Sequence, residues 1–137
     1  MQGKFICHKD FENLKPIDVF HKELSPNQTK KHAENLYNRH TLFRKKAVFG
    51  KASKAILKIT ADDYFKLYIN GVYVTQGPPP SYPDHYYFME IDVTPFLKEG
   101  VNTFAVHTYY QGLINRVWVS GDLRSMFWCE LYLDGKV

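Results

Sequence analysis

Two adjacent segments of the sequence alternate apolar and polar residues with a period of two, which strongly limits how this chain can fold. The segments are residues 54–61 and 64–70. A period of two is typical of a strand that buries one face and exposes the other. Asn70 and Gly71 then stand directly before a third strand-like run, residues 72–76. Asn-Gly between such runs indicates a tight hairpin, because a type I′ turn needs positive φ at both positions. These segments predict an antiparallel sheet.

The same kind of pattern continues through the rest of the chain from residue 39 onward. Turn-forming residues, including the rigid proline run 78–80, separate the runs, and no β-α-β pattern occurs. Seven or eight short strands with frequent turns predict an all-β sandwich or barrel. The remaining strand-like runs are residues 40–49, 85–92, 101–110 and 126–133.

Residues 1–38 lack this regular pattern. Residues 5–7 can form a short strand, and residues 28–37 are compatible with a short helix. Ser25 would cap that helix and Pro26 would occupy its first position. We therefore expect a lead-in over residues 1–38 that packs on a sandwich domain over residues 39–137.

The last strand-like run is followed by a second hairpin signal. Asp134 and Gly135 favour a tight turn, but only Lys136 and Val137 remain after it. This pattern predicts that the chain is cut inside a hairpin of a longer protein or close to a domain end.

Composition narrows the class of protein. The chain has 137 residues with 45% hydrophobic and 23% charged residues, as expected for one globular domain with a real core. No apolar run reaches the ~20 residues needed to span a bilayer, and the N-terminus lacks a signal-peptide core. We expect a cytoplasmic protein without a membrane partner. Cys7 and Cys129 form no CxxC pair, so we expect free thiols, with Cys129 buried.

Charge is distributed unevenly along the chain. Residues 1–58 contain 13 basic and 5 acidic residues, a net of +8, whereas residues 59–137 have a net of −4. A basic half can indicate a nucleic-acid or membrane surface. The sequence has no RNP-type aromatic pair, GxxG clamp or zinc knuckle. We therefore favour solvated lysines and expect no nucleic-acid partner.

Catalytic signals are weak. Asp62 and Asp63 are the only adjacent acidic pair, but glycoside hydrolysis needs two carboxyl groups that face each other across the bond. Neighbours in a turn diverge, so a turn in which one Asp accepts backbone N–H bonds is favoured. His107 lies within a strand and is interpreted as structural. The sequence has no nucleophile elbow or metal-ligand spacing, so we expect no catalytic residue, metal or cofactor. A calcium site using Asp62 or Asp122 stays an alternative.

Aromatic and polar side chains gather near strand ends and in the segment that follows Gly112. Rings cover the C–H faces of sugars, and amide, carboxylate and guanidinium groups bind their hydroxyls. The same residue types also build protein interfaces, and we favour the interface narrowly. The candidates are Tyr82, His85, Tyr86, Tyr110, Gln111, Asn115, Arg116, Trp118 and Asp122.

Several strings of this sequence resemble the N-terminal domain of bacterial α-L-rhamnosidases. They are residues 59–71, residues 76–87, Tyr109-Tyr-Gln-Gly-Leu-Ile-Asn-Arg-Val-Trp118 and Ser120-Gly-Asp122, within a resemblance that covers about residues 39–135. The chain departs from the pattern at Val119, where Asn is expected, and at Asp84, where an aromatic residue is expected.

The resemblance implies a galactose-binding-like jelly-roll sandwich placed before a large catalytic domain. In such enzymes the parent chain removes terminal α-L-rhamnosyl groups, and its carboxylates lie in the downstream domain. None of those carboxylates maps onto this chain, so we expect a module that is inactive alone. The expected partner is the downstream catalytic domain. The alternative is a lectin-like module for rhamnose-containing glycans.

Overall fold

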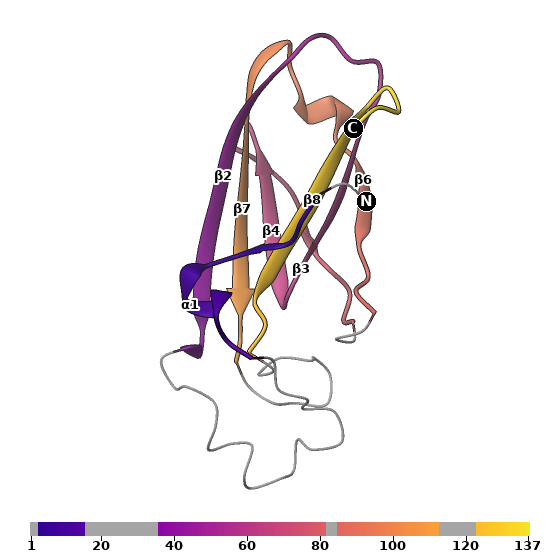
Figure 1. The fold of residues 1–137 in the computed structure, drawn as a ribbon. Helices are drawn as coiled ribbons and strands as arrows, with labels where there is room; N and C mark the ends of the chain where they lie inside the picture. The colour runs from indigo at the N-terminus through magenta and orange to yellow at the C-terminus, as the bar shows by residue number, and fades with distance from the viewer. Residues whose placement is uncertain (1–2, 16–35, 82–84, 113–122) are drawn as a thin grey trace, which may run out of the picture.

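The computed structural model describes residues 3–15, 36–81, 85–112 and 123–137, and they form a sandwich of two antiparallel sheets (Figure 1). The predicted all-β sandwich is confirmed, and the jelly-roll topology stays a prediction. Sheet A has the order β1-β8-β3-β6 and sheet B has the order β2-β7-β4-β5. In sheet A the strands are β1 (Ile6–Cys7), β8 (Met126–Leu133), β3 (Ala55–Ala61) and β6 (Met89–Asp92). In sheet B they are β2 (Arg39–Phe49), β7 (Gly100–Tyr110), β4 (Tyr64–Ile69) and β5 (Val72–Gly77).

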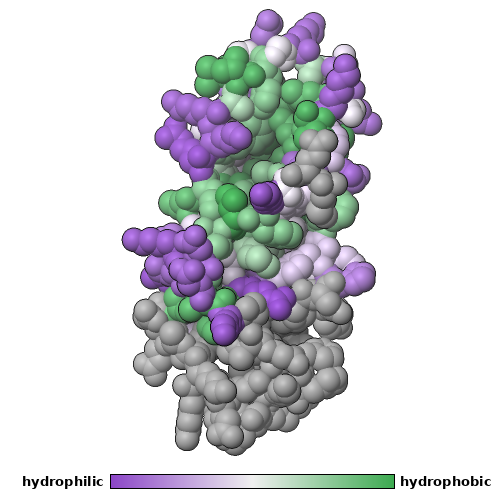
Figure 2. Space-filling model, viewed as in Figure 1, coloured by the Kyte–Doolittle hydropathy of each residue, from purple (hydrophilic) through white to green (hydrophobic). Residues whose placement is uncertain are grey.

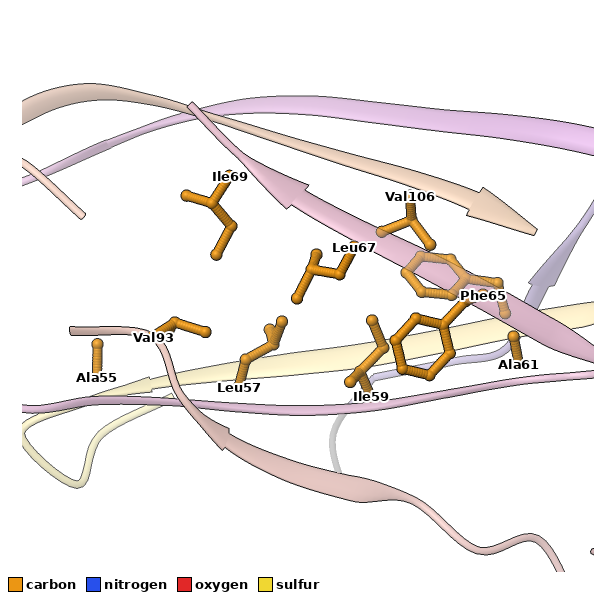
Figure 3. Close-up of a cluster of buried hydrophobic side chains, with 10 residues drawn as sticks. Ala55, Leu57, Ile59, Ala61, Phe65, Leu67, Ile69, Val93 and Val106 are labelled. Carbon is orange, nitrogen blue, oxygen red and sulfur yellow. The ribbon is translucent and has the colours of Figure 1, made fainter. Parts of the chain in front are cut away.

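The core lies between the two sheets and consists of the apolar faces that the alternation predicts (Figure 3). Inward side chains of β3 and β4 are at most 2% exposed. Burying such a side chain stabilises a fold by about 1.5–3 kcal/mol, which favours this register over a slip by one residue. The labelled core residues are Ala55, Leu57, Ile59, Ala61, Phe65, Leu67, Ile69, Val93 and Val106.

Both predicted hairpin turns are present. Asn70 and Gly71 have φ values of 52° and 83° and join β4 to β5. Asp134 and Gly135 have φ values of 48° and 82°, and Leu133 and Lys136 form a bridge across the turn. The Asp134 carboxylate also accepts hydrogen bonds from the backbone N–H groups of Ser53 and Lys54, at 3.1 and 2.9 Å. This second turn is therefore fixed to the start of β3.

The described part of the N-terminal lead-in packs on the sandwich. The short strand predicted at residues 5–7 is confirmed as β1, which pairs with β8 at Ile6 and Phe127. The helix α1 (Lys9–Glu12) was not predicted, and it buries Phe11. The helix predicted at residues 28–37 lies mostly outside the described residues. The described residues also include the short 3-10 helix η2 (Thr94–Phe96). In the described ranges no helix is long and apolar enough to cross a membrane.

The prediction that Cys129 is buried is wrong, because this residue is exposed. Cys129 has the same parity along β8 as the core residues Phe127 and Leu131, so the alternation predicts an inward side chain. On the side away from β3, however, β1 covers β8 only at Met126 and Phe127. Further along, Gly3 contacts β8 again, and its backbone N–H donates to Glu130 Oε1. In the described ranges no strand pairs with that edge of β8 at Cys129. Figure 2 shows hydrophobic residues gathered in the middle of the face that β8 crosses, between hydrophilic groups.

Candidate functional site

The sequence-predicted site residues divide into two groups. Five of them lie outside the described residues: Tyr82, Asn115, Arg116, Trp118 and Asp122. The other four, His85, Tyr86, Tyr110 and Gln111, are described and lie near one end of the sandwich, around the turn between β3 and β4.

The turn between β3 and β4 links the two sheets through Asp62 and Asp63, which are 7% and 5% exposed. The Asp62 backbone N–H donates to the carbonyl of Met126 in sheet A at 2.8 Å, and that of Asp63 donates to Tyr109 in sheet B at 3.2 Å. The Asp63 carboxylate accepts from the backbone N–H of Gln111 at 2.7 Å. The predicted structural role of this acidic pair is confirmed, since the carboxylates bind separate partners.

The Asp62 carboxylate holds Tyr86. The Tyr86 hydroxyl donates to Asp62 Oδ2 at 2.9 Å, and its ring lies 5.7 Å from the ring of Phe5. The next residue, Tyr87, accepts at its carbonyl a hydrogen bond of 2.6 Å from the Thr60 hydroxyl. His85, in contrast, is exposed. This loop is therefore tied to the lead-in and to β3 at positions 86 and 87.

Tyr110 is a core residue of the small cluster beneath α1. It is 1% exposed, and its ring meets Phe11 edge-on with centroids 5.0 Å apart. Its hydroxyl accepts a hydrogen bond of 3.1 Å from the backbone N–H of Leu123. Tyr86, Tyr110 and Gln111 therefore each bind groups within this domain. The alternation did not predict the contact of Tyr110, because it carries no information on α1.

His107 is hydrogen-bonded on the outer face of sheet B, which agrees with the structural role expected for it. His40 Nδ1 lies 2.8 Å from His107 Nε2, and the His40 ring stacks on Tyr109 at 4.8 Å. Burial, followed by the neighbouring His40 and Lys66, lowers the pKa of His107 below its ordinary value. Sequence reasoning missed His40, because only the pairing of β2 with β7 brings the two rings together.

A buried amide network, also missed in the sequence, joins the Asn70–Gly71 turn to the segment between η2 and β7. Asn102 is 0% exposed. Its Oδ1 accepts from the backbone N–H of Lys98 at 2.9 Å and from Asn70 Nδ2 at 2.8 Å. Its Nδ2 donates to the carbonyls of Lys98 and Gly100 at 2.7 and 3.1 Å. The network fixes three backbone segments at one end of sheet B.

No group of three or more His, Cys, Asp and Glu side chains with metal-binding geometry occurs in the part of the chain that the structure describes. Asp62, one candidate for a calcium ligand, instead accepts the bond from Tyr86. The other candidate, Asp122, lies outside the described residues.

Comparison with solved structures identifies relatives of this sandwich. The GH78 family rhamnosidase of Bacillus sp. GL1 matches 73% of this chain with a TM-score of 0.67 and 30% identity. The α-L-rhamnosidase of Aspergillus terreus matches 72% of this chain with a TM-score of 0.53 and 24% identity. The α-L-rhamnosidase of Streptomyces avermitilis, solved with L-rhamnose, matches 75% with a TM-score of 0.50 and 20% identity. The last two matches show the fold alone.

This chain spans only a small part of those proteins. The matched regions cover 11%, 13% and 10% of the Bacillus, Aspergillus and Streptomyces chains, respectively. No protein-family model matches the sequence, and no curated protein matches it. The resemblance to α-L-rhamnosidases that the sequence suggested is confirmed by the structural matches.

Proposed function

Because this chain carries a β-sandwich domain related to those of GH78 α-L-rhamnosidases, we propose that it is a non-catalytic module of such an enzyme. In this proposal the sandwich packs on a catalytic domain that removes terminal α-L-rhamnosyl groups. The observation that carries the proposal is the use of Asp62 and Asp63 as buried hydrogen-bond acceptors between the sheets. Glycoside hydrolysis needs two carboxyl groups that face the scissile bond from opposite sides. This pair serves the fold instead.

Apolar groups on the surface support packing against another domain. Tyr87 and Phe88, which follow the candidate residue Tyr86, are 51% and 41% exposed. The hydrophobic residues gathered on the face that β8 crosses add a second apolar area (Figure 2). Aromatic residues of this kind are enriched at protein interfaces, and contiguous apolar areas on a surface often mark contact sites.

Incubation of the 137-residue chain with an aryl α-L-rhamnoside tests the proposal. We expect release of the aryl group at the background rate, while a complete rhamnosidase in a parallel reaction turns the substrate over. Turnover by this chain well above background would contradict a non-catalytic role. A protein without glycosidase activity, added at the same concentration, controls for nonspecific hydrolysis.

An NMR titration with L-rhamnose separates the packing role from the carbohydrate-binding alternative. A packing module shows no saturable shifts. Saturable shifts that are lost in Trp118→Ala would instead favour the lectin-like alternative, because an aromatic ring supplies much of the contact with a sugar face.

A further inference from the structure

Strands β2, β7 and β4 lie side by side in sheet B (Figure 1). Their register places aromatic and basic side chains in rows across the outer face of the sheet. Strand register places Arg44 beside Ala105 and Ala105 beside Tyr68, which in turn pairs with Tyr73. The next row places Lys46 beside Thr103. Because Ala105 and Thr103 are small, the middle of the face is lower than its aromatic and basic sides.

A hollow of about 520 Å³ occupies this low region. Ala105 and Thr103 lie on β7 in its centre, and Arg44 and Tyr68 come from the strands on either side. Lys98 lines it from the segment after η2. Its volume is within the ~300–1,000 Å³ that is usual for sites that bind small molecules, although it is open to solvent.

The end of this hollow is held in place by the buried Asn102 network. Asn102 binds both the N–H and the carbonyl of Lys98, and Asn70 accepts from the backbone N–H of Thr103 at 3.0 Å. The Tyr68 ring is positioned by Tyr73, whose centroid lies 5.6 Å away at an angle of 66°. The Lys98 backbone and the Tyr68 ring are fixed in this way, so they lose little conformational freedom when a ligand binds.

The charge of the hollow is entirely positive. Arg44 and Lys98 line it and no acidic residue does. The ion pairs within the described ranges involve His8, Arg39 and Lys58, so neither Arg44 nor Lys98 is neutralised by a carboxylate there. Lys46 and Lys66 add positive charge to the same face of the sheet. An anion is therefore the ligand that this electrostatic environment favours.

We propose that this hollow binds a saccharide with a carboxylate group, a hexuronate unit, through Tyr68 and Arg44 with Lys98 alongside. A pyranose presents a C–H face that packs on a tyrosine ring. A guanidinium binds a carboxylate through two parallel N–H···O bonds, and the lysine ammonium adds a point charge. The choice of a saccharide over other anions rests on the proposed function as a glycosidase module. The position of the binding site and its preference for an anion rest on the lining residues alone.

An NMR titration of the 15N-labelled chain with trigalacturonate at low salt tests this site. We expect saturable amide shifts centred on Thr103 and Ala105. The methyl-esterified trisaccharide, which has the same rings without the charge, is expected to bind at least about tenfold more weakly, because charge-assisted bonds are the stronger ones. Arg44→Gln and Tyr68→Ala should each weaken binding of the acid by about tenfold or more.

Lys46→Gln is the matched control, since Lys46 is a cation on the same face of β2 that does not line the hollow. We expect it to change the affinity by no more than about twofold, as a screened charge outside the site. An equal loss in Lys46→Gln and Arg44→Gln would show nonspecific attraction and overturn the proposal. So would equal binding of the methyl ester, or full competition by inorganic phosphate at the same concentration.

The titration does not depend on rhamnoside turnover. Absence of saturable shifts would overturn the hexuronate site and leave the non-catalytic module standing. Turnover of an aryl α-L-rhamnoside would contradict the module and leave the hollow untouched.

Discussion

Replacing Asn102 with alanine tests whether the buried amide network holds one end of sheet B. The change removes four hydrogen bonds, two through Oδ1 and two through Nδ2. Each contributes about 0.5–1.5 kcal/mol net, and the contributions are not additive. Asn70 Nδ2 also keeps its bond to the carbonyl of Phe96 at 2.9 Å. We therefore expect the free energy of unfolding to fall by about 2–4 kcal/mol, since part-buried backbone groups of Lys98 and Gly100 lose their partners.

Urea denaturation followed by far-UV circular dichroism measures this change, provided that the transition is two-state. Gln76→Ala is the control, because it removes an exposed amide on β5, and we expect a change within about 0.5 kcal/mol. Asn102→Asp keeps the size of the side chain but cannot donate to Lys98 and Gly100 when ionised. We expect this variant to lose more of its free energy of unfolding at pH 7 than at a pH below the ordinary carboxyl pKa of about 4. If Asn102→Ala lowers the free energy of unfolding by less than about 1 kcal/mol, the amide network does not hold this end of sheet B.

Two further predictions concern titratable side chains. Because the folded pKa of His107 is lowered, the unfolded chain binds a proton first as pH falls, so stability should decrease below the unfolded pKa of about 6.5. Between pH 7.5 and 5, the urea midpoint of His107→Gln should depend less steeply on pH than that of the wild type. An equal slope in the two proteins would contradict this prediction. Cys129 is exposed but partly shielded by the strands, and this desolvation raises the pKa of its thiol. In a Cys7→Ser background, iodoacetamide should label native Cys129 slowly at pH 7 and faster toward pH 9, whereas labelling only after unfolding would contradict its exposure.

Local features of the sequence account for most of the sandwich. The Asn70–Gly71 turn follows from residues that tolerate positive φ, and the inward faces of β3 and β4 follow from their alternation. The helix α1 was not predicted, because a segment of four residues has no helical periodicity to detect. The error at Cys129 has a related cause. Alternation specifies the side of a strand, but exposure depends on which strands cover it.

The candidate site was less predictable than the fold. The sequence indicated that Asp62 and Asp63 form a turn, and the structure shows which groups they bind. Tyr110 and Gln111 were grouped with ligand-facing candidates because aromatic and amide groups serve sugars and interfaces equally. Only the packing of Phe11 against Tyr110 shows that this tyrosine belongs to a core cluster.

The sequence by itself determined the strand faces, the two hairpin turns and the turn that Asp62 and Asp63 form. Each depends on residues close together in the chain, where backbone conformation and side-chain period act directly. Only the tertiary structure decided that His40 meets His107, and that Arg44, Tyr68 and Lys98 surround one hollow. Those residues lie on different strands and loops. Their proximity is set by the order and register of strands in sheet B, which the burial of the whole core fixes together.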